Sequence, residues 1–365
     1  MIRVGITEMH GIAQEYSKFP PEGVEYSEIR TSDRITKRVF KSAAKGVYAY
    51  AYSPECDVLE APLFPVITNQ PWIYTPAHFS SAGSFDFLGV PTPRFMKMQF
   101  AKRLLLRKNF KRLIFKSEFG RRSLYEYGGI ESRALLDKTS VVHPVVRRVD
   151  DQNIVFQDKN INMLFVGEFL RKGGANVVDA FMRLNQEYDG LRLTICSSRN
   201  FQTTNPDLKK KYLKKIDDCE NIDMKFVNRE TLFDEILPNA DIYLCPTYKE
   251  AWGFSIQEAM AFGVPVIATN ISAIPEIIDN GASGILVDIE SHSYIRGMRG
   301  YVVDELSEDF SNYLTEQVYL HAKRLIDDFE YRKTIGLGGL EVARTKFSVE
   351  RRNEIMSDIY RQAVM

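Results

Sequence analysis

Two glutamates eight residues apart are the first candidates for chemistry in this chain. Glu250 and Glu258 stand in the stretch TYKEAWGFSIQEAMAFGVPVIAT, residues 247–269, and Gly253 lies between them. A strand is expected to end just before this loop, and a helix is expected to begin near Ser255. The first turn of a helix offers unpaired N–H groups and the positive end of the helix dipole, and together these bind anions. The pattern therefore predicts a diphosphate site on the loop, which Gly253 allows a ligand to approach closely.

The two acids would then serve different parts of such a ligand. Glu258, one turn into the expected helix, can accept hydrogen bonds from two vicinal hydroxyls, as a ribose offers. Glu250, on the loop before the helix, would face whatever lies beyond the diphosphate. A purely structural interpretation is open as well, because Ser255 and Glu258 have the spacing of a capping box. That arrangement needs no ligand, and this segment alone does not decide between the two.

The elements that must position these residues alternate regularly in the second half of the chain. Short apolar runs separated by helix-length segments indicate a parallel sheet covered on both faces, a doubly wound Rossmann-like α/β domain. Its ligand should lie at the carboxyl ends of the strands. Strands are expected over 162–169, 191–197, 223–228, 241–247, 264–269 and 283–288, and helices over 174–188, 206–219, 230–240 and 273–280.

The first half is less regular but also reads as an α/β domain. MIRVGIT, DVLEAPLF and PWIYTPAH look like core strands, and residues 112–129 look like a strand, a cap and a helix. Residues 140–153 follow a strand and carry a proline and a charge cluster, as a linker does. We therefore expect one domain over 1–145 and a second over 146–346, with a terminal helix over 347–365.

Composition excludes several classes of protein. The chain has 365 residues and no net charge, yet residues 1–150 hold 23 Lys and Arg against 15 Asp and Glu, and the remainder holds 25 against 33, so the halves carry +8 and −8. The four cysteines are scattered, which argues against a zinc site or a disulfide framework. No run reaches the roughly 18 apolar residues of a membrane span. The chain opens on a strand-like run instead of a signal peptide, so we expect a cytoplasmic protein.

The run from Glu250 to Glu258, followed by EAMAFGVPVIAT and AIPEIIDNGASGILVD, resembles the donor-binding signature of family 4 glycosyltransferases. The likeness is dense over residues 160–290 and looser outside them. These enzymes have the GT-B fold, two Rossmann-like domains that face each other across a cleft. The resemblance implies that the terminal helix over 347–365 crosses back and packs on the first domain. The resemblance implies a retaining enzyme whose co-substrate is a nucleotide-diphosphate sugar, with UDP and GDP both compatible. It implies no cofactor and no obligatory metal ion.

The resemblance also assigns roles to single residues of the loop. Glu258 would hold the ribose hydroxyls, and Glu250 would lie near the hydroxyls of the donor sugar and the reacting face. The diphosphate would be cradled by the backbone amides of Trp252, Gly253, Phe254 and Ser255.

The segment FVNRETL, residues 226–232, resembles the family stretch that lines the base. It makes Val227 and Arg229 candidates for contact with the nucleotide. A solvent-facing helix cap is an equal alternative for Arg229.

A second donor motif is recognisable in VGEFLRKGGANVVDAF, residues 166–181. Lys172 stands before a glycine, as in the family, where a cation can stabilise the departing nucleoside diphosphate without a metal. The family's usual arginine position is occupied by Glu168, and the spacing is one residue short. Arg171 is the candidate for supplying the second positive charge from a shifted position. A lone Lys-Gly after a strand is otherwise only a turn.

The acceptor side is less clearly marked. His78, in PWIYTPAHFSSAGSF, resembles the family histidine that lies near the anomeric carbon, although Phe79 replaces the aspartate that commonly follows it. A half-buried structural histidine is the alternative. His10 competes for the role, and beside it the glycine-rich acceptor loop of the family is reduced to Gly11.

Residues 94–117 are the source of the positive first half. They hold nine Lys and Arg and no acid, with apolar residues interleaved. This composition suits an interfacial helix on anionic lipid, so we expect peripheral membrane contact here. The alternative is a solvated basic face whose apolar residues pack on the domain. No nucleic-acid-binding motif accompanies the charge.

The function that the resemblance implies is transfer of a hexose from a UDP- or GDP-sugar to a glycan or lipid-linked acceptor. Retention in this family is ascribed to attack on the face that the leaving phosphate occupies, with that phosphate taking the acceptor's proton, so no side chain serves as a nucleophile. Two alternatives stay open. One is another enzyme on the same fold, such as a sugar phosphorylase or a nucleotide-sugar epimerase. The other is a subunit that binds sugar nucleotide without turnover, which Glu168 and the reduced glycine loop suggest.

Overall fold

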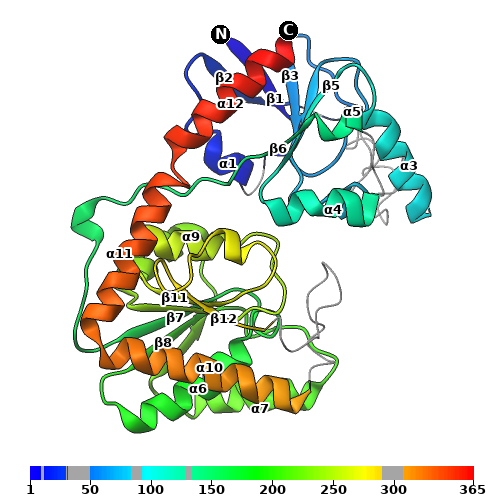
Figure 1. Cartoon of the computed structure of the whole chain (residues 1–365). Coiled ribbons are helices and arrows are strands. Elements are labelled where there is room, and N and C mark those ends of the chain that lie inside the picture. Colours follow the sequence, from blue (N-terminus) through cyan, green and yellow to red (C-terminus); the bar gives the residue numbers. More distant parts are fainter. Residues whose placement is uncertain (10–11, 30, 32–49, 84–92, 129–132, 290–306) are drawn as a thin grey trace. The chain divides into compact units, whose positions relative to one another are not determined.

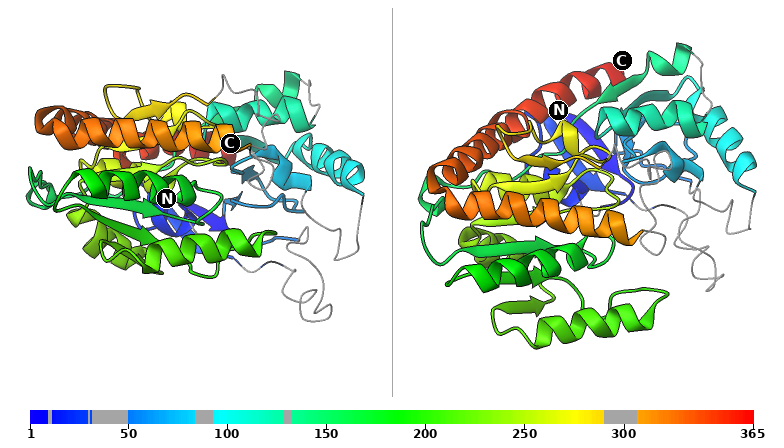
Figure 2. Two further views of the ribbon diagram at one scale, coloured as in Figure 1. Left: turned by 90° about the horizontal axis from the view of Figure 1, so that it is seen from below. Right: turned by 60° about the horizontal axis from the view of Figure 1, so that its bottom comes forward.

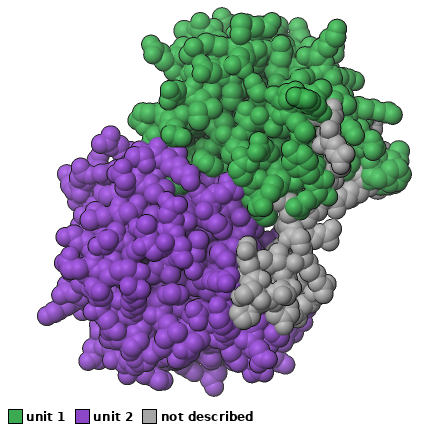
Figure 3. All heavy atoms as spheres, in the orientation of Figure 1, with its two compact units in different colours: residues 1–145, 347–365 green, residues 146–346 purple. Residues whose placement is uncertain are grey.

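The computed structural model describes residues 1–9, 12–29, 31, 50–83, 93–128, 133–289 and 307–365. These residues form two compact units (Figure 3). Unit 1 holds Met1–Val145 with Phe347–Met365, and unit 2 holds Val146–Lys346. Each unit has a parallel sheet of its own, covered by helices (Figure 1), which is the α/β architecture that the alternation of strands and helices predicts.

Unit 1 is built on a parallel sheet in the order β2-β1-β3-β4-β5-β6. The strands expected at DVLEAPLF and PWIYTPAH are shorter than predicted, because Pro62 and Pro76 have no N–H group to donate to a neighbouring strand. The strands are β1 Ile2–Ile6, β2 Val24–Glu28, β3 Val58–Ala61, β4 Trp72–Tyr74, β5 Phe110–Phe115 and β6 Thr139–Val141.

Helices pack on this sheet, and two apolar cores lie between the helices and the strands. One core includes Trp72, Leu104 and Phe110. The other is completed by the last helix of the chain, whose Met356 and Tyr360 pack with residues of the sheet. The helices are α1 Ile12–Tyr16, the 3-10 turn η1 Phe79–Gly83, α3 Arg94–Leu105, α4 Glu118–Gly128, α5 Arg133–Leu136 and α12 Val349–Val364.

The basic segment 94–117 is not one interfacial helix, so that prediction is wrong in its extent. Helix α3 ends at Leu105, and residues 110–115 of the segment form β5 inside the sheet. Leu104 and Leu105 are buried in the core of unit 1. Phe95 and Met96, at the start of α3, are by contrast 69% and 50% exposed.

Unit 2 has a second parallel sheet in the order β12-β11-β10-β7-β8-β9. All residues of β10 and β11 are buried, as expected of strands covered on both faces. The strands are β7 Asn162–Val166, β8 Arg192–Cys196, β9 Ile222–Lys225, β10 Ile242–Cys245, β11 Val266–Thr269 and β12 Ile285–Val287.

The helices of unit 2 follow the expected order, with one correction. The helix expected over 273–280 is only a 3-10 turn, Ile274–Glu276, because the chain turns back at Gly281, whose φ of 77° is left-handed. The others are η2 Asp151–Asn153, α6 Gly174–Glu187, α7 Pro206–Asp217, α8 Arg229–Thr231, the π turn η3 Leu232–Ile236, η4 Leu237–Asn239, α9 Phe254–Ala261, α10 Glu308–Asp327 and α11 Phe329–Thr345.

The long helix α10 lies along α6 on one side of the unit 2 sheet (Figures 1 and 2). Asn176 of α6 is 1% exposed, and its amide donates to the Ser311 carbonyl and to the Thr315 hydroxyl, each at 2.9 Å. The amide is thereby satisfied in a buried place, where an unpaired polar group would be costly. These hydrogen bonds hold the start of α6 in place. Lys172 lies in the turn between β7 and α6, and its position depends on this helix.

Candidate functional site

The capping-box interpretation of the loop between β10 and α9 is wrong. Gly253 is the N-cap residue, with φ 123° and ψ 50°, and no side chain caps the helix. The Ile256 and Gln257 amides donate to the Gly253 carbonyl at 3.0 and 3.2 Å, so the helix starts before Ser255 can serve as a cap. The Ser255 hydroxyl accepts instead from the Tyr243 hydroxyl at 2.7 Å.

Glu258 is buried in α9 and forms an ion pair with Arg229. Glu258 is 6% exposed, and its Oε1 accepts from Nε and Nη2 of Arg229 at 3.0 and 2.6 Å. The N-cap of α8 is Asn228, whose Oδ1 accepts from the Thr231 amide at 2.8 Å. The alternative of Arg229 as a helix cap facing solvent is therefore wrong. Val227, just before this turn, is half-buried.

Glu250 forms the second ion pair, with Lys172. The two side chains are 13% and 12% exposed. The other carboxylate oxygen of Glu250 accepts from the amides of Ala251 and Trp252, at 2.9 and 3.3 Å. Burial lowers the pKa of Lys172, and the neighbouring Arg171 lowers it further. The amide of Trp252, which we expected to donate to a diphosphate, thus donates to a carboxylate of the chain itself.

The turn after β7 brings Lys172 to the loop after β10. Gly173 is the N-cap of α6 with φ 80°, and a Cβ there would lie 2.2 Å from the Pro246 carbonyl oxygen, so a side chain has no room where the two segments meet. The Arg171 carbonyl accepts from the Tyr248 amide at 3.0 Å. The Arg171 side chain is exposed, and its amide donates to the Glu168 carboxylate at 2.7 Å.

The remaining predicted donor residues support the loop. Trp252 is 1% exposed, and its indole N–H donates to Gln257 at 2.7 Å, which fastens the loop to α9. Gly253 is buried, and Phe254 and Ser255 are half-buried. The predicted donor residues thus all lie in unit 2, and the sheet brings their separate segments together.

The predicted acceptor-side residues belong to unit 1. His78 follows β4 in a loop and is half-buried, with its ring 6.4 Å from that of Phe119. His10 and Gly11 lie outside the described residues. Within the described part of the chain, no group of three or more His, Cys, Asp or Glu residues is placed to hold a metal ion. The four cysteines are free and buried.

The sequence analysis missed a polar cluster in unit 1. Glu60 of β3 is 1% exposed, and its carboxylate accepts from the hydroxyls of Tyr16, at 2.7 Å, and of Tyr360. Arg352 of α12 is 7% exposed and places its guanidinium 4.0 Å from the centre of the Tyr16 ring. One signal was present: Glu60 is the single acid in an otherwise apolar run. Its partners could not be read from the sequence, because Tyr360 is 300 positions away.

Comparison with known proteins identifies the fold as GT-B. The structure resembles that of a glycosyltransferase from Rickettsia africae with a TM-score of 0.66 at 14% identity, over 100% of this chain and 98% of that one. It also resembles Anabaena HepE in complex with UDP-glucose, with a TM-score of 0.62 at 14% identity, over 98% and 99% of the two chains. Identities this low speak for the fold alone.

The sequence comparisons match part of the chain to a family. Residues 146–317 match the model of the Glycosyl transferases group 1. N-acetyl-alpha-D-glucosaminyl L-malate synthase of Bacillus anthracis is 25% identical over 159 residues, which are 42% of this chain and 40% of that protein. The match thus spans less than half of that relative. Over residues 146–317 the chain thus matches the group 1 glycosyltransferases, the family that the sequence resemblance implied.

Proposed function

We propose that this chain transfers a hexose from a UDP- or GDP-linked donor to an acceptor, with retention at the anomeric carbon. One observation carries the proposal. Lys172 follows β7 and Glu250 follows β10, the two strands are neighbours in the unit 2 sheet, and the two side chains meet at their carboxyl ends. Ligands of open α/β sheets bind in this place.

The donor would bind in two parts. Glu258 would accept hydrogen bonds from the ribose hydroxyls, and Val227 and Arg229 would lie beside the base. The diphosphate would lie at the start of α9, whose amides and dipole favour negative charge. For this, Lys172 must turn from Glu250 to the phosphates, because the ion pair now engages its ammonium.

The reaction would need no protein nucleophile. Lys172, with Arg171 beside it, would stabilise the charge that develops on the leaving diphosphate, as fixed cations do in place of a metal. Glu250 would hold hydroxyls of the donor sugar. The acceptor would attack from the face that the phosphate leaves, and that phosphate would take its proton. His78, and His10 with Gly11, are the proposed acceptor-side residues.

The acceptor would be a glycan or a lipid-linked molecule. A small organic acid is a further candidate, because one relative is an N-acetyl-alpha-D-glucosaminyl L-malate synthase. Peripheral membrane contact would use α3, where Phe95 and Met96 are exposed beside the basic residues of the segment. None of the described helices is long and apolar enough to cross a membrane.

A thermal-shift panel of UDP, GDP, ADP and their sugar conjugates, with and without Mg²⁺, tests the donor site. A ligand at a hundred times its dissociation constant adds roughly 2.7 kcal/mol to the folded state. We expect one base to stabilise the chain without metal, and product analysis with that donor then tests transfer and retention. Stabilisation by none of these nucleotides would refute the proposal.

A second candidate is a subunit that binds sugar nucleotide without turnover. The observation that favours it is Glu168, which places a carboxylate where the family has an arginine and whose Oε1 is buried without a hydrogen-bond partner in the described structure. Donor binding with neither transfer nor donor hydrolysis would support this candidate. A phosphorylase or an epimerase would instead yield a sugar phosphate or an altered nucleotide sugar.

A further inference from the structure

A buried chain of hydrogen bonds in unit 2 connects α10 with the loop after β10. The amide nitrogen of Asn176 donates to the carbonyl of Ser311 and to the hydroxyl of Thr315, both in α10. The amide oxygen of Asn176 accepts from the hydroxyl of Tyr248. Tyr248 is 3% exposed, and the centre of its ring lies 6.3 Å from that of Phe310, also in α10. One side chain of the β10 loop is thus held by both α6 and α10.

The amide of Asn176 is satisfied in one orientation. An asparagine amide has two N–H donors on one side and an oxygen acceptor on the other. With the nitrogen toward α10, both N–H groups have acceptors and the oxygen has a donor. If the amide were turned over, its oxygen would face the Ser311 carbonyl, and two acceptors would lie together. Because Asn176 is 1% exposed, water could not compensate for this loss, so the network fixes the place of the Tyr248 hydroxyl.

Tyr248 also joins the two segments that carry the ion pair of the candidate site. Its backbone amide donates to the Arg171 carbonyl at 3.0 Å, and Arg171 directly precedes Lys172. Glu250 follows Tyr248 by two positions. The hydroxyl of Tyr248 holds it on the helices, and its amide holds the turn after β7. The separation between the backbones of Lys172 and Glu250 is therefore set through Tyr248.

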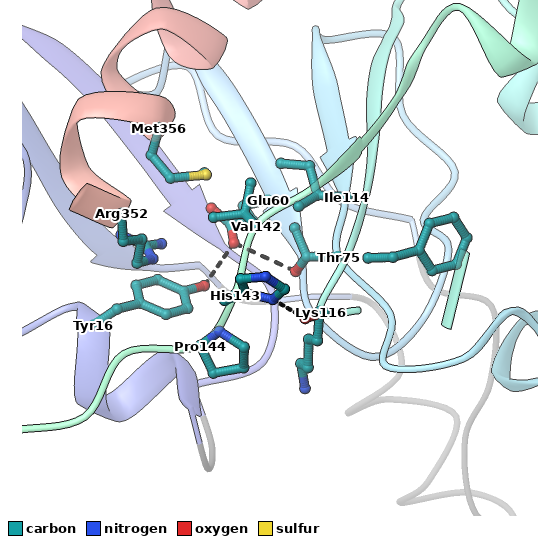
Figure 4. Close-up of a pocket in the computed structure, with 11 residues that line it drawn as sticks. Tyr16, Glu60, Thr75, Ile114, Lys116, Val142, His143, Pro144, Arg352 and Met356 are labelled. Carbon is teal, nitrogen blue, oxygen red and sulfur yellow. Dashed lines mark hydrogen bonds between the residues drawn. The ribbon is translucent and has the colours of Figure 1, made fainter. Parts of the chain in front are cut away.

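The polar cluster of unit 1 has a different place in the fold. Glu60 of β3 accepts there from the Tyr360 hydroxyl of α12, and Arg352 of the same helix lies over the Tyr16 ring (Figure 4). These contacts join the last helix to the sheet. The hydrogen bonds of Asn176 lead instead from two helices to a loop that carries a residue of the candidate site.

We propose that Tyr248 and Asn176 are positioning residues, and that the hydrogen bond between them keeps Lys172 and Glu250 placed for the reaction. The inference rests on the proposed function, because Lys172 and Glu250 are the groups that would act on the leaving diphosphate and the donor sugar. Misplacing such groups by about 1 Å can lower turnover about a hundred-fold. Contacts to the base and the ribose lie on other segments, so nucleotide binding should depend on this hydrogen bond much less than turnover does.

The first test needs no catalysis. Hydrogen exchange of the full chain, followed by mass spectrometry, reports how readily residues 247–253 open. Tyr248→Phe keeps the ring and removes only the hydroxyl, so exchange over 247–253 should become at least about three-fold faster while exchange over β11 stays the same. Tyr319→Phe is the matched control, because it removes a hydroxyl that joins α10 to Glu187 at the end of α6. Equal exchange over 247–253 in Tyr248→Phe and the unaltered chain would overturn the proposal.

The second test separates positioning from stability. Tyr248→Phe should lower kcat at least about ten-fold and change the affinity for UDP or GDP less than about three-fold. It should also lower the melting temperature, because the Asn176 oxygen loses its donor. Adding Asn176→Leu removes that unpaired oxygen, so the melting temperature should recover in part while kcat stays low.

The outcomes distinguish this inference from the proposed function. An unaltered kcat in Tyr248→Phe, or a kcat that recovers together with the melting temperature in the double variant, would overturn the positioning role and leave the function standing. Absence of nucleotide binding in the unaltered chain would refute the function. The exchange experiment would then still decide whether the Tyr248 hydroxyl holds the loop in place.

Discussion

The ammonium of Lys172 lies against the carboxylate of Glu250, although the two residues are 78 positions apart in the chain. The same carboxylate accepts from the amides of Ala251 and Trp252. Glu250 therefore binds the ammonium of Lys172 and the N–H group of Trp252, the two groups that we propose as ligands of the diphosphate. In this form of the chain, a carboxylate of the loop stands where the ligand's negative charge would be.

This relationship gives opposite expectations for turnover and for nucleotide binding. Glu250→Ala should lower kcat about a hundred-fold or more, because a group that positions the donor sugar is lost. The affinity for UDP or GDP should stay the same or rise, because Lys172 no longer has a competing carboxylate. Calorimetry with the nucleotide and initial rates with its sugar conjugate measure the two effects. Glu316→Ala, which removes an exposed ion pair in the same unit, is the control.

Glu258 and Arg229 allow a test of the nucleoside site. Glu258→Ala should weaken nucleotide binding at least about ten-fold, because a charged acceptor for two ribose hydroxyls is removed. The ion pair with Arg229 predicts non-additivity, and a double-mutant cycle on unfolding should give a coupling of about 0.5–3 kcal/mol. Equal nucleotide affinity in Glu258→Ala and the unaltered chain would contradict the assignment. Because Gly253 is the N-cap residue of α9 and no side chain caps this helix, loss of a capping box cannot explain the effect.

The sequence predicts where the strands, loops and helices of this site lie better than it predicts which side chains contact each other. The strand, loop and helix around Gly253 lie within a residue or two of their expected places, since apolar runs and a glycine mark them. The capping-box alternative at Ser255 was wrong, because the φ of 123° that makes Gly253 the N-cap residue is a property of the folded loop. Arg229 was expected at the base or in solvent and not on Glu258, since pairing between segments follows from the fold. The polar cluster of unit 1 was missed for the same reason: Glu60 and Arg352 come together only after α12 returns to unit 1.

The turn after β7 lies so close to the loop after β10 that a single added methyl group at Gly173 should lower the free energy of unfolding strongly. Gly173→Ala would place a Cβ 2.2 Å from the Pro246 carbonyl oxygen at a φ of 80°. Gly281→Ala is the matched control, with a φ of 77° and no atom within 4 Å of the added Cβ. Both should lose about 1–2 kcal/mol from the left-handed backbone. Gly173→Ala should lose about 2 kcal/mol more in chemical denaturation, and equal losses would mean that the loops separate readily.

The environment of Lys116 predicts a pH dependence of stability. Its pKa falls from 10.5 to about 8 on folding, so between these values the unfolded chain binds more protons and this site's contribution to stability rises with pH. Below about pH 8 both states are protonated, and the full penalty of the buried ammonium is present. The free energy of unfolding of the unaltered chain, relative to Lys116→Met, should therefore increase between pH 7.5 and 10. A difference that stays flat over this range would show that the ammonium is fully hydrated.

The start of α3 predicts how unit 1 would meet a membrane. Phe95 and Met96 are exposed, while Leu104 and Leu105 of the same helix are buried, so the large apolar side chains that α3 itself exposes lie in its first turn. Phe95→Ser combined with Met96→Ser should reduce sedimentation with anionic vesicles, because apolar insertion and attraction to the headgroups act together. Phe226→Ser is the control, since Phe226 is 82% exposed and belongs to unit 2. Binding that is lost at high salt and unchanged by the double substitution would mean that the basic residues act alone, without insertion of α3.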